Sequence, residues 1–321
     1  MILKNIFRSI FITTLSLSAT KISIAQTGKT LQTIIVDAGH GGTDPGAVGQ
    51  YENSLRSTEK DITLAIAMKL VKTLKKRMPD VNVVPTRTTD VYQPVKEKAR
   101  IANENKGDLF LCIHADSGPI KTGKRQIGTK TVTKYKISYT GTGKKRRKVS
   151  TPYQEDVPIY EYFKMPLTRK GTSVYIFAAH KTSDKLKAIS SGDEEIEPET
   201  NADDSSIAPI DYNSPQGRAI AQIYAKKYQE RSDKIAQLVN DEVGRTGREA
   251  LGVSQRQTGI WVLQATNMPA ILIETGYVNN PEDERYLNSE KGQQELADAI
   301  TDAVIKYKAI FEANKTTKNN N

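Results

Sequence analysis

A continuous apolar run near the middle of the chain, residues 109–113, constrains the fold more than any other sequence feature. Its five residues, LFLCI, do not alternate with polar ones, so both faces of the strand that they predict must be covered. Strands of this kind occur in parallel sheets that carry helices on both sides. Other β-rich runs alternate with helical patterns, and we therefore expect an α/β sandwich on a mainly parallel sheet of about six strands.

The predicted strands and helices alternate along the chain. The β-rich runs lie at 33–36, 81–84, 109–113, 174–177, 260–263 and 270–273. Apolar residues at helical spacing predict helices at 59–78, 95–105, 231–243 and 294–311. This alternation fits a single sandwich domain flanked by helices, which we place at residues 31–312. The polar segment 313–321 has no large apolar side chain to bury, and we expect it to be a disordered tail.

The first 25 residues have the features of a secretory signal peptide in the usual order. Lys4 and Arg8 precede an apolar stretch that is too short to span a bilayer, and Ser23 and Ala25 supply a cleavage site between small residues. A buried N-terminal helix is the alternative. We expect export to the periplasm or beyond it to the cell envelope, with no integral membrane segment after cleavage. The single cysteine excludes an internal disulfide framework.

Two charged segments interrupt the alternation of strands and helices. Residues 120–150 hold eleven Lys or Arg and no acid, whereas residues 191–206 hold seven Asp or Glu and no base. Both have few aliphatic residues to bury, so we expect insertions at about 119–170 and 183–214. The formal net charge of +10 comes mainly from the signal peptide and the basic segment. Because the rest of the chain is close to neutral, we expect no nucleic-acid partner.

Three side chains with catalytic potential lie at the ends of predicted strands. His40 follows the first strand inside a glycine-rich turn, DAGHGG, and His114 follows the run at 109–113. Glu274 comes directly after the last predicted strand. The carboxyl ends of parallel strands gather at one edge of a sheet, where α/β proteins build their sites. Glu59, at the start of the first long helix, is close in sequence to the His40 turn.

Two imidazoles and a carboxylate suit a catalytic zinc ion, which keeps one position open for water. A second carboxylate that is not a ligand can then accept a proton. Each residue also has an ordinary structural explanation: a lone histidine is often hydrogen-bonded, Glu59 can complement a helix dipole, and Glu274 can pair with a Lys or Arg. All four at one sheet edge favour a metal site.

Four ordered motifs resemble those of the zinc-dependent N-acetylmuramoyl-L-alanine amidases, the bacterial cell-wall amidase family of type 3. The motifs are TIIVDAGHGG with TDPGAVG, then TEKDITLAIA, then DLFLCIHADS, then MPAILIETGYVNNPEDE. The resemblance covers residues 31–307 apart from the two insertions. Four motifs in this order are far more specific than an isolated HGG.

The resemblance implies a role for each residue at a motif position. His40, Glu59 and His114 correspond to the zinc ligands, and Glu274 corresponds to the catalytic carboxylate. Glu52 is the alternative to Glu59, but it lacks the Lys-Asp pair that follows in the motif. The implied reaction is hydrolysis of the amide between N-acetylmuramic acid and the L-alanine of the stem peptide. Peptidoglycan is then the substrate, and the implied role is cell-wall remodelling and daughter-cell separation.

Four further residues are candidates to support this site. The family pattern Arg-x-x-Asn recurs at Arg100 and Asn103, and the resemblance implies that they brace the edge of the site. Asp37 and Asp116 are candidates to accept hydrogen bonds from the ligating histidines, with turn stabilisation as an equal alternative.

Two other reactive side chains need an explanation. Cys112 shares a strand face with His114, and the alternatives are a nucleophile, a soft metal ligand and a small packing residue. His180 lies outside the motifs, and a surface or supporting position is expected for it.

The insertions lead to two hypotheses. The basic segment is either a solvated, flexible hairpin or an element that adheres to anionic cell-wall or membrane components. Related amidases with insertions in the acidic region can be inhibited by an inserted helix. We therefore consider that the acidic segment, or residues 215–229, covers the zinc until an activator protein displaces it. A solvated loop is the alternative.

Two further classes of protein are compatible with parts of this sequence. A peptidoglycan-binding module without catalysis does not require all four site residues. A zinc peptidase shares the chemistry, and only the products separate it from an amidase.

Overall fold

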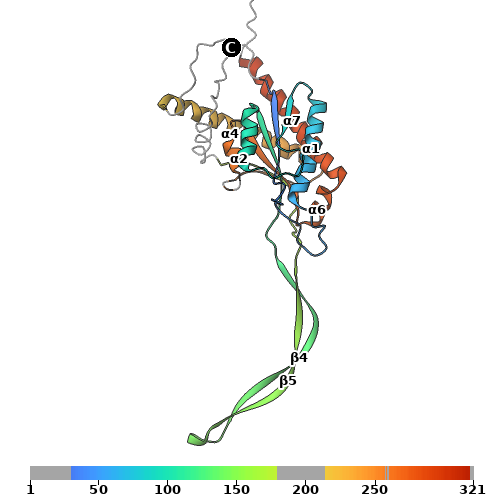
Figure 1. Ribbon diagram of the computed structural model, residues 1–321, viewed down its shortest axis with the longest axis vertical. Coiled ribbons are helices and arrows are strands. Elements are labelled where there is room, and N and C mark those ends of the chain that lie inside the picture. Colours follow the sequence, from blue (N-terminus) through green and yellow to red (C-terminus); the bar gives the residue numbers. More distant parts are fainter. Residues whose placement is uncertain (1–29, 179–213, 257, 259, 319–321) are drawn as a thin grey trace, which may run out of the picture.

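The computed structural model of the chain describes residues 30–178, 214–256, 258 and 260–318. The predicted signal peptide, the acidic segment and His180 lie outside these residues. Within them, helices cover both faces of a six-stranded sheet (Figure 1). The expected fold class, an α/β sandwich on a mainly parallel sheet of about six strands, is confirmed.

The sheet has the strand order β2-β1-β3-β8-β6-β7. Its strands are β1 (Thr33–Ala38), β2 (Asn82–Pro85), β3 (Leu109–Asp116), β6 (Thr172–Phe177), β7 (Ala250–Arg256) and β8 (Ala270–Tyr277). Strands β1, β2, β3 and β8 are parallel, whereas β6 runs antiparallel to β8 and parallel to β7. The carboxyl ends of the four parallel strands therefore lie at one edge of the sheet.

Two hydrophobic cores lie on the two faces of the sheet. One face packs against α1 (Glu59–Arg77), α4 (Pro215–Arg245) and α7 (Glu290–Lys318). The other face packs against α2 (Val95–Glu104) and the short α5 (Trp261–Ala265). Within β3, Leu111 belongs to the first core, and Phe110 and Cys112 belong to the second. Because neighbouring residues of a strand point to opposite faces, this explains the unbroken apolar run.

Two local expectations are wrong, and one strand was not predicted. The apolar run at 260–263, expected as a strand, belongs mostly to α5, because a short buried run is compatible with either structure. The sixth strand is instead β7, whose residues are mostly half-buried and whose Gly252 has a φ of +94°. The backbone of α7 continues as a helix to Lys318, beyond the expected start of the disordered tail. A short helix, α6 (Pro281–Leu287), precedes it.

The basic insertion is an ordered hairpin, which we call the arm (residues 122–164). Strands β4 (Thr122–Thr140) and β5 (Arg147–Lys164) pair along their length, and a turn that includes η1 (Gly143–Lys145) joins them. The arm leaves the sheet directly after β3 and extends far from the domain (Figure 1). The Glu52 amide donates to the Lys164 carbonyl (3.1 Å), and Glu52 also pairs with Arg125 (2.9 Å) at the arm's base.

No helix among the described residues is long and apolar enough to cross a membrane.

Phe110 tests the importance of the central strand. Its side chain is fully buried, so we expect Phe110→Ala to lower the free energy of unfolding by about 3–5 kcal/mol, because the variant leaves a cavity. Tyr135 on the arm is 63% exposed. We expect Tyr135→Ala to change the free energy of unfolding by no more than about 0.5 kcal/mol. Urea unfolding followed by circular dichroism measures both. Equal losses would contradict this assignment of the core.

Candidate metal centre

His40 lies in a tight turn directly after β1. Its backbone has a φ of 59°, in the left-handed region that is uncommon for residues other than glycine. Arg87 holds this turn in place: Nη2 donates to the carbonyls of Gly39 (2.9 Å) and Lys60 (2.8 Å). Because Lys60 belongs to α1, the buried guanidinium links the turn to the helix that carries Glu59.

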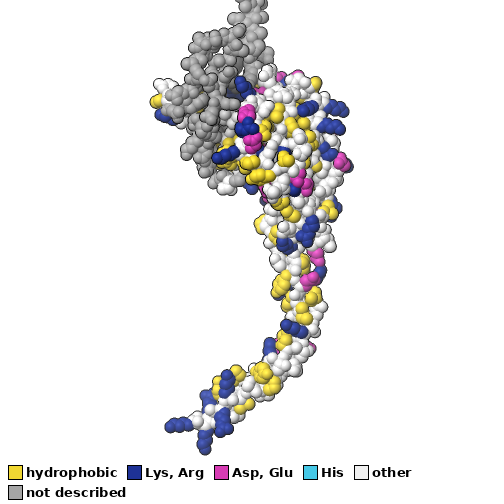
Figure 2. Space-filling model, in the orientation of Figure 1, with side chains coloured by type: hydrophobic (Ala, Val, Ile, Leu, Met, Phe, Trp, Pro, Cys, Tyr) yellow, Lys and Arg dark blue, Asp and Glu magenta, His cyan; other side chains and the backbone are white. Residues whose placement is uncertain are grey.

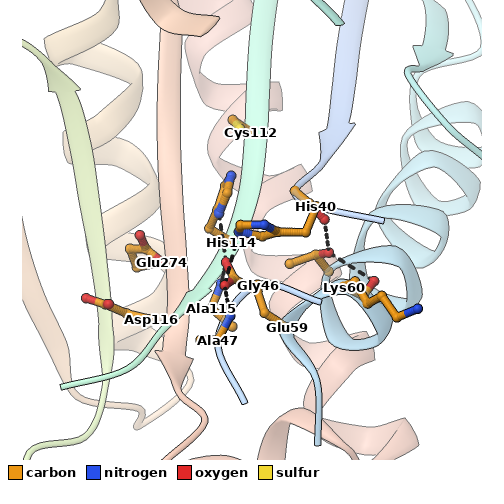
Figure 3. Close-up of polar contacts among 12 residues, drawn as sticks. His40, Gly46, Ala47, Glu59, Lys60, Cys112, His114, Ala115, Asp116 and Glu274 are labelled. Atoms are coloured by element: carbon orange, nitrogen blue, oxygen red, sulfur yellow. Dashed lines mark hydrogen bonds and ion pairs between the residues drawn. The ribbon is translucent and has the colours of Figure 1, made fainter. Parts of the chain in front are cut away.

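The pairing of β3 with β8 brings His114 beside Glu274. The two residues are partners in the parallel register, and both lie within their strands rather than after them. Both residues lie near the carboxyl ends of their strands, the edge of the sheet at which the sequence predicts the site (Figure 3). Tertiary pairing thus joins two motifs that are far apart in the chain.

The Glu59 carboxylate lies between the two imidazoles (Figure 3). Its Oε1 is 2.7 Å from His114 Nδ1, and its Oε2 is 3.1 Å from His40 Nε2. The backbone amides of Ala47 (2.8 Å) and Ala115 (3.0 Å) also donate to it. These contacts satisfy a carboxylate that is only 5% exposed.

Gly46 leaves the space for the contact between Glu59 and His40. A Cβ at Gly46 would lie 2.5 Å from Glu59 Oε2 and 2.6 Å from His40 Cδ2, and the residue has a φ of +64°. Any side chain here would displace the imidazole or the carboxylate.

The charges at this edge of the sheet shift the pKa values of Glu59 and His40. Burial alone would raise the pKa of the Glu59 carboxyl, but hydrogen bonds and charge from His114 and His40 hold the pKa well below its usual range. Burial opposes the charged form of His40, yet Glu59 and Asp44 raise its pKa to about 9. Without a metal ion, the carboxylate thus favours the protonated form of the His40 imidazole.

The residues present fit a zinc ion. One donor atom from each of His40, Glu59 and His114 lies within 4.8 Å of the others. Two imidazole nitrogens and a carboxylate oxygen are the donor types that catalytic zinc sites use. A cation at this position would balance the negative charge of the buried Glu59 carboxylate. Asp44 Oδ2, 2.8 Å from His40 Nδ1, holds the second ring nitrogen, as is usual for metal-binding histidines.

Glu274 lies beside this cluster with one oxygen unsatisfied. Its Oε1 accepts a hydrogen bond from Arg256 Nη1 at 2.9 Å. Its Oε2 is buried and has no hydrogen-bond partner among the described residues. Burial raises the pKa of Glu274 to about 7, against the effect of the nearby His114. A carboxylate with this pKa can both accept and return a proton near neutral pH.

One cleft of about 210 Å³ contains all four residues. The lining residues are His40, Ala47, Glu59, His114, Ala115, Asp116, Ser117, Arg256, Leu272 and Glu274. Residues 215–229 do not contribute to this lining. Instead, Gln229 Nε2 donates to the carbonyl of Phe177 (3.0 Å), at the far end of β6 from the cleft. The expectation that residues 215–229 cover the site is therefore wrong.

The structure brings together the four principal residues predicted from the sequence. Glu59 lies between the histidines, whereas Glu52 lies at the base of the arm and pairs with Arg125. Asp116 lines the cleft, where its Oδ1 accepts a hydrogen bond from the Ser117 amide (2.7 Å), in agreement with the turn alternative.

The other supporting residues lie elsewhere. Arg100 pairs with Glu97 and Glu104 on its own helix and is exposed. Asn103 ties α2 to the residues after α5, donating to the Ala265 carbonyl (3.1 Å) and accepting from the Asn267 amide (2.9 Å). Neither residue lines the cleft, so the expectation that they brace its edge is wrong. Arg100 pairs within α2 because acidic partners are available one turn away on the same helix.

Asp37 does not contact the histidines, contrary to the expectation that it accepts hydrogen bonds from them. It lies under the site and forms an ion pair with Lys98 Nζ at 2.9 Å. Thr86 (2.6 Å) and Cys112 (3.0 Å) donate hydrogen bonds to the same carboxylate. Burial raises the pKa of the Cys112 thiol well above its usual value, so Cys112 is a protonated packing residue rather than a nucleophile.

Sequence reasoning missed Asp44, Arg87, Lys98 and Arg256. Asp44 is four residues after His40 and could have been found from that short spacing. Arg256 ends the strand that was not predicted, so its approach to Glu274 had no local signal. Lys98 and Arg87 reach the site from segments far from their partners, and only the folded chain joins them.

The family model for N-acetylmuramoyl-L-alanine amidases (Amidase_3) matches residues 34–306. The chain belongs to this family. It is 26% identical over 274 residues to N-acetylmuramoyl-L-alanine amidase AmiC of Escherichia coli O6:H1, a match that covers 85% of this chain and 52% of AmiC. It is 24% identical to AmiA of Escherichia coli K12, with 88% of this chain and 78% of AmiA covered. The chain thus spans about half the length of several curated relatives that it matches.

A solved structure has the same fold. The crystal structure of an N-acetylmuramoyl-L-alanine amidase from Clostridium difficile 630 superposes with a TM-score of 0.52 and 22% identity. The match covers 87% of this chain and 97% of that one. At this identity the likeness supports the fold.

The pair of Asp37 and Lys98 should control acid stability. The folded-state pKa of Asp37 is lowered, because the pull of Lys98 and the hydrogen bonds outweigh the effect of burial. The stabilisation is therefore complete above the usual carboxyl pKa and is lost as the pH falls through the lower folded value. We expect Lys98→Met to cost about 3–5 kcal/mol at neutral pH, since it leaves a buried charge unpaired.

The double variant Asp37→Asn/Lys98→Met is the matched control. It should lose much less stability than Lys98→Met and show a weaker dependence of unfolding free energy on acid pH. Urea unfolding at neutral and acid pH measures both. Additive losses from the two substitutions would show that the residues are not coupled.

Proposed function

We propose that this chain is a zinc-dependent peptidoglycan hydrolase that cleaves the amide between N-acetylmuramic acid and the L-alanine of the stem peptide. The observation that carries the proposal is the convergence of His40, Glu59 and His114 within 4.8 Å, in the same cleft as a buried Glu274 with an unsatisfied oxygen. Membership of the amidase family supports the choice of substrate.

His40, Glu59 and His114 would hold the zinc ion, with Asp44 fixing the orientation of the His40 ring. Zinc, when bound, supplies Lewis-acid polarisation of the scissile carbonyl and makes water more acidic. Glu274 lines the cleft, and its unpaired Oε2 would accept the proton of the attacking water. The same carboxyl then delivers that proton to the leaving amine of L-alanine. This double role needs a carboxyl pKa near neutrality, as Glu274 has. Arg256 positions Glu274 through its other oxygen.

The cellular setting is part of the same proposal. Residues 1–25 direct export, and the enzyme acts in the periplasm or cell envelope on peptidoglycan, in wall remodelling and daughter-cell separation. The order of charged, apolar and small residues supports export. The amidase names of the relatives support the wall as substrate.

The roles of the site residues are tested on purified sacculi. The zinc-loaded chain should release complete stem peptides that begin with a free L-alanine amine, as identified by mass spectrometry. Glu274→Gln should keep its zinc but lose about 10²–10⁴-fold in rate, because it cannot accept a proton. His40→Ala and His114→Ala should lose zinc as measured by elemental analysis, and a chelator should stop the wild type.

Glu52→Gln is the matched control, since it changes a nearby carboxylate outside the cleft. It should keep both zinc and activity. Activity close to wild type in zinc-loaded Glu274→Gln would remove Glu274 as the base. Cleavage within or between stem peptides would identify a peptidase instead.

We also propose that the acidic segment 191–206 restrains the site until an activator protein displaces it. The motive is seven carboxylates in one insertion of a protein whose site is suited to a cation. Deletion of residues 191–206 should raise the basal rate of stem-peptide release, with unchanged zinc content. An unchanged rate would contradict inhibition by this segment, and a solvated loop would explain it.

A further inference from the structure

The arm has no role in the proposed chemistry, yet in the described part of the chain it is the largest feature outside the sheet domain. Its two strands form eighteen residue pairs, from Thr122 with Lys164 to Thr140 with Arg147. At about 3.3 Å per residue, the arm reaches about 60 Å. Among the described elements, β4 and β5 form a sheet only with each other. A two-stranded ribbon is marginally stable alone, which favours a partner for its outer part.

The outer part of the arm, residues 135–154, carries uncompensated positive charge. It begins beyond the ion pair of Lys134 with Glu155 (2.7 Å), and it contains no Asp or Glu. Its basic residues are Lys136, Lys144, Lys145, Arg146, Arg147 and Lys148. All six are exposed, and none has an ion-pair partner in the part of the chain that the structure describes. Figure 2 shows Lys and Arg side chains gathered at the far end.

An apolar stripe lies next to this charge. Tyr135, Ile137 and Tyr139 alternate along β4, so their side chains share one face of the ribbon. They are 63%, 52% and 56% exposed. The Arg146 guanidinium lies over the Tyr139 ring, 4.4 Å from its centre. Amphipathic tyrosines beside flexible basic side chains are typical of the boundary between water and a lipid bilayer.

We propose that residues 135–154 dock on an anionic phospholipid surface. The cations around the turn, Lys144 to Lys148, would face the lipid phosphates, and Tyr135, Ile137 and Tyr139 would enter the headgroup layer. A neutral glycan is less suited as a partner, because it offers no anions to these six unpaired cations. Gln154 carries the only side-chain amide in this segment, and carboxylates and tryptophan are absent from it.

Docking would set the distance between the bilayer and the cleft. The base of the arm is tied to the domain by backbone hydrogen bonds from Glu52 to Lys164 (3.1 Å) and from Leu167 to Asn279 (2.8 Å). The cleft begins at the end of β3, directly before the arm. The inner part of the arm, residues 122–134 and the strand paired with them, therefore acts as a spacer of about 40 Å between the membrane and the cleft.

Vesicle binding tests the charged part of the proposal. The full chain should sediment with vesicles of phosphatidylcholine and phosphatidylglycerol at low salt, but not with phosphatidylcholine alone. The tip variant Lys144→Gln/Lys145→Gln/Lys148→Gln should lower the partition constant by about 100-fold, because each cation near an anionic surface contributes roughly fivefold. Added salt should weaken wild-type binding in the same way.

A matched control removes the same charge from the domain. Lys72, Lys75 and Lys76 are exposed on α1, and their triple substitution to Gln should leave binding within about twofold. Because all variants share one background, any contribution of residues 1–25 is common to them. Circular dichroism should show that both variants keep the wild-type fold. Equal losses in the two variants would overturn the proposal, since net charge alone would then explain binding.

The apolar stripe has its own readout. Tyr135→Thr/Tyr139→Thr keeps β-forming residues but should lower the partition constant that remains at high salt. Two other outcomes would overturn the proposal: equal binding of the wild type to uncharged vesicles, and sedimentation with purified peptidoglycan or nucleic acid without vesicle binding. The second outcome would assign the arm to a polymer.

Discussion

The buried Glu59 carboxylate is the contact on which the site depends. It joins three segments: the start of α1, the loop that carries Ala47, and the end of β3 with His114. A carboxylate at 5% exposure is costly unless its oxygens are hydrogen-bonded, and here two amides and two imidazoles bond to it. The same contacts place the imidazole nitrogens where a cation can replace their protons. One arrangement thus accounts for stability and for the proposed metal affinity.

The parallel sheet supplies the second constraint. The register of β1, β3 and β8 brings the His40 turn, His114 and Glu274 to one edge. Directly beneath them, Asp37 and Lys98 form a buried pair on the face covered by α2. A protein interior tolerates such charges only as satisfied pairs. The pair of Asp37 and Lys98 holds α2 against the sheet. Polar groups in the core therefore position the elements that carry the chemistry.

Sequence reasoning found the principal site residues because each is marked locally. His40 has its glycine turn, His114 and Glu274 complete apolar runs, and Glu59 begins an amphipathic helix. Residues without such signals were missed or misplaced. Arg256 lies on a half-exposed edge strand, and Arg100 forms ion pairs on its own helix. A short apolar run such as 260–263 does not distinguish a strand from a helix, because burial alone does not encode backbone conformation.

The sequence by itself determined the fold class and the four side chains with catalytic potential, because hydrophobic periodicity and turn residues act over a few neighbouring positions. It also placed the basic insertion outside the core. Only the tertiary structure decided the partners: Asp44 for His40, Arg256 for Glu274, and Lys98 for Asp37. It likewise decided that the basic insertion is an ordered arm of paired strands. These features depend on pairings between distant segments, whose geometry exists only once the backbone has folded.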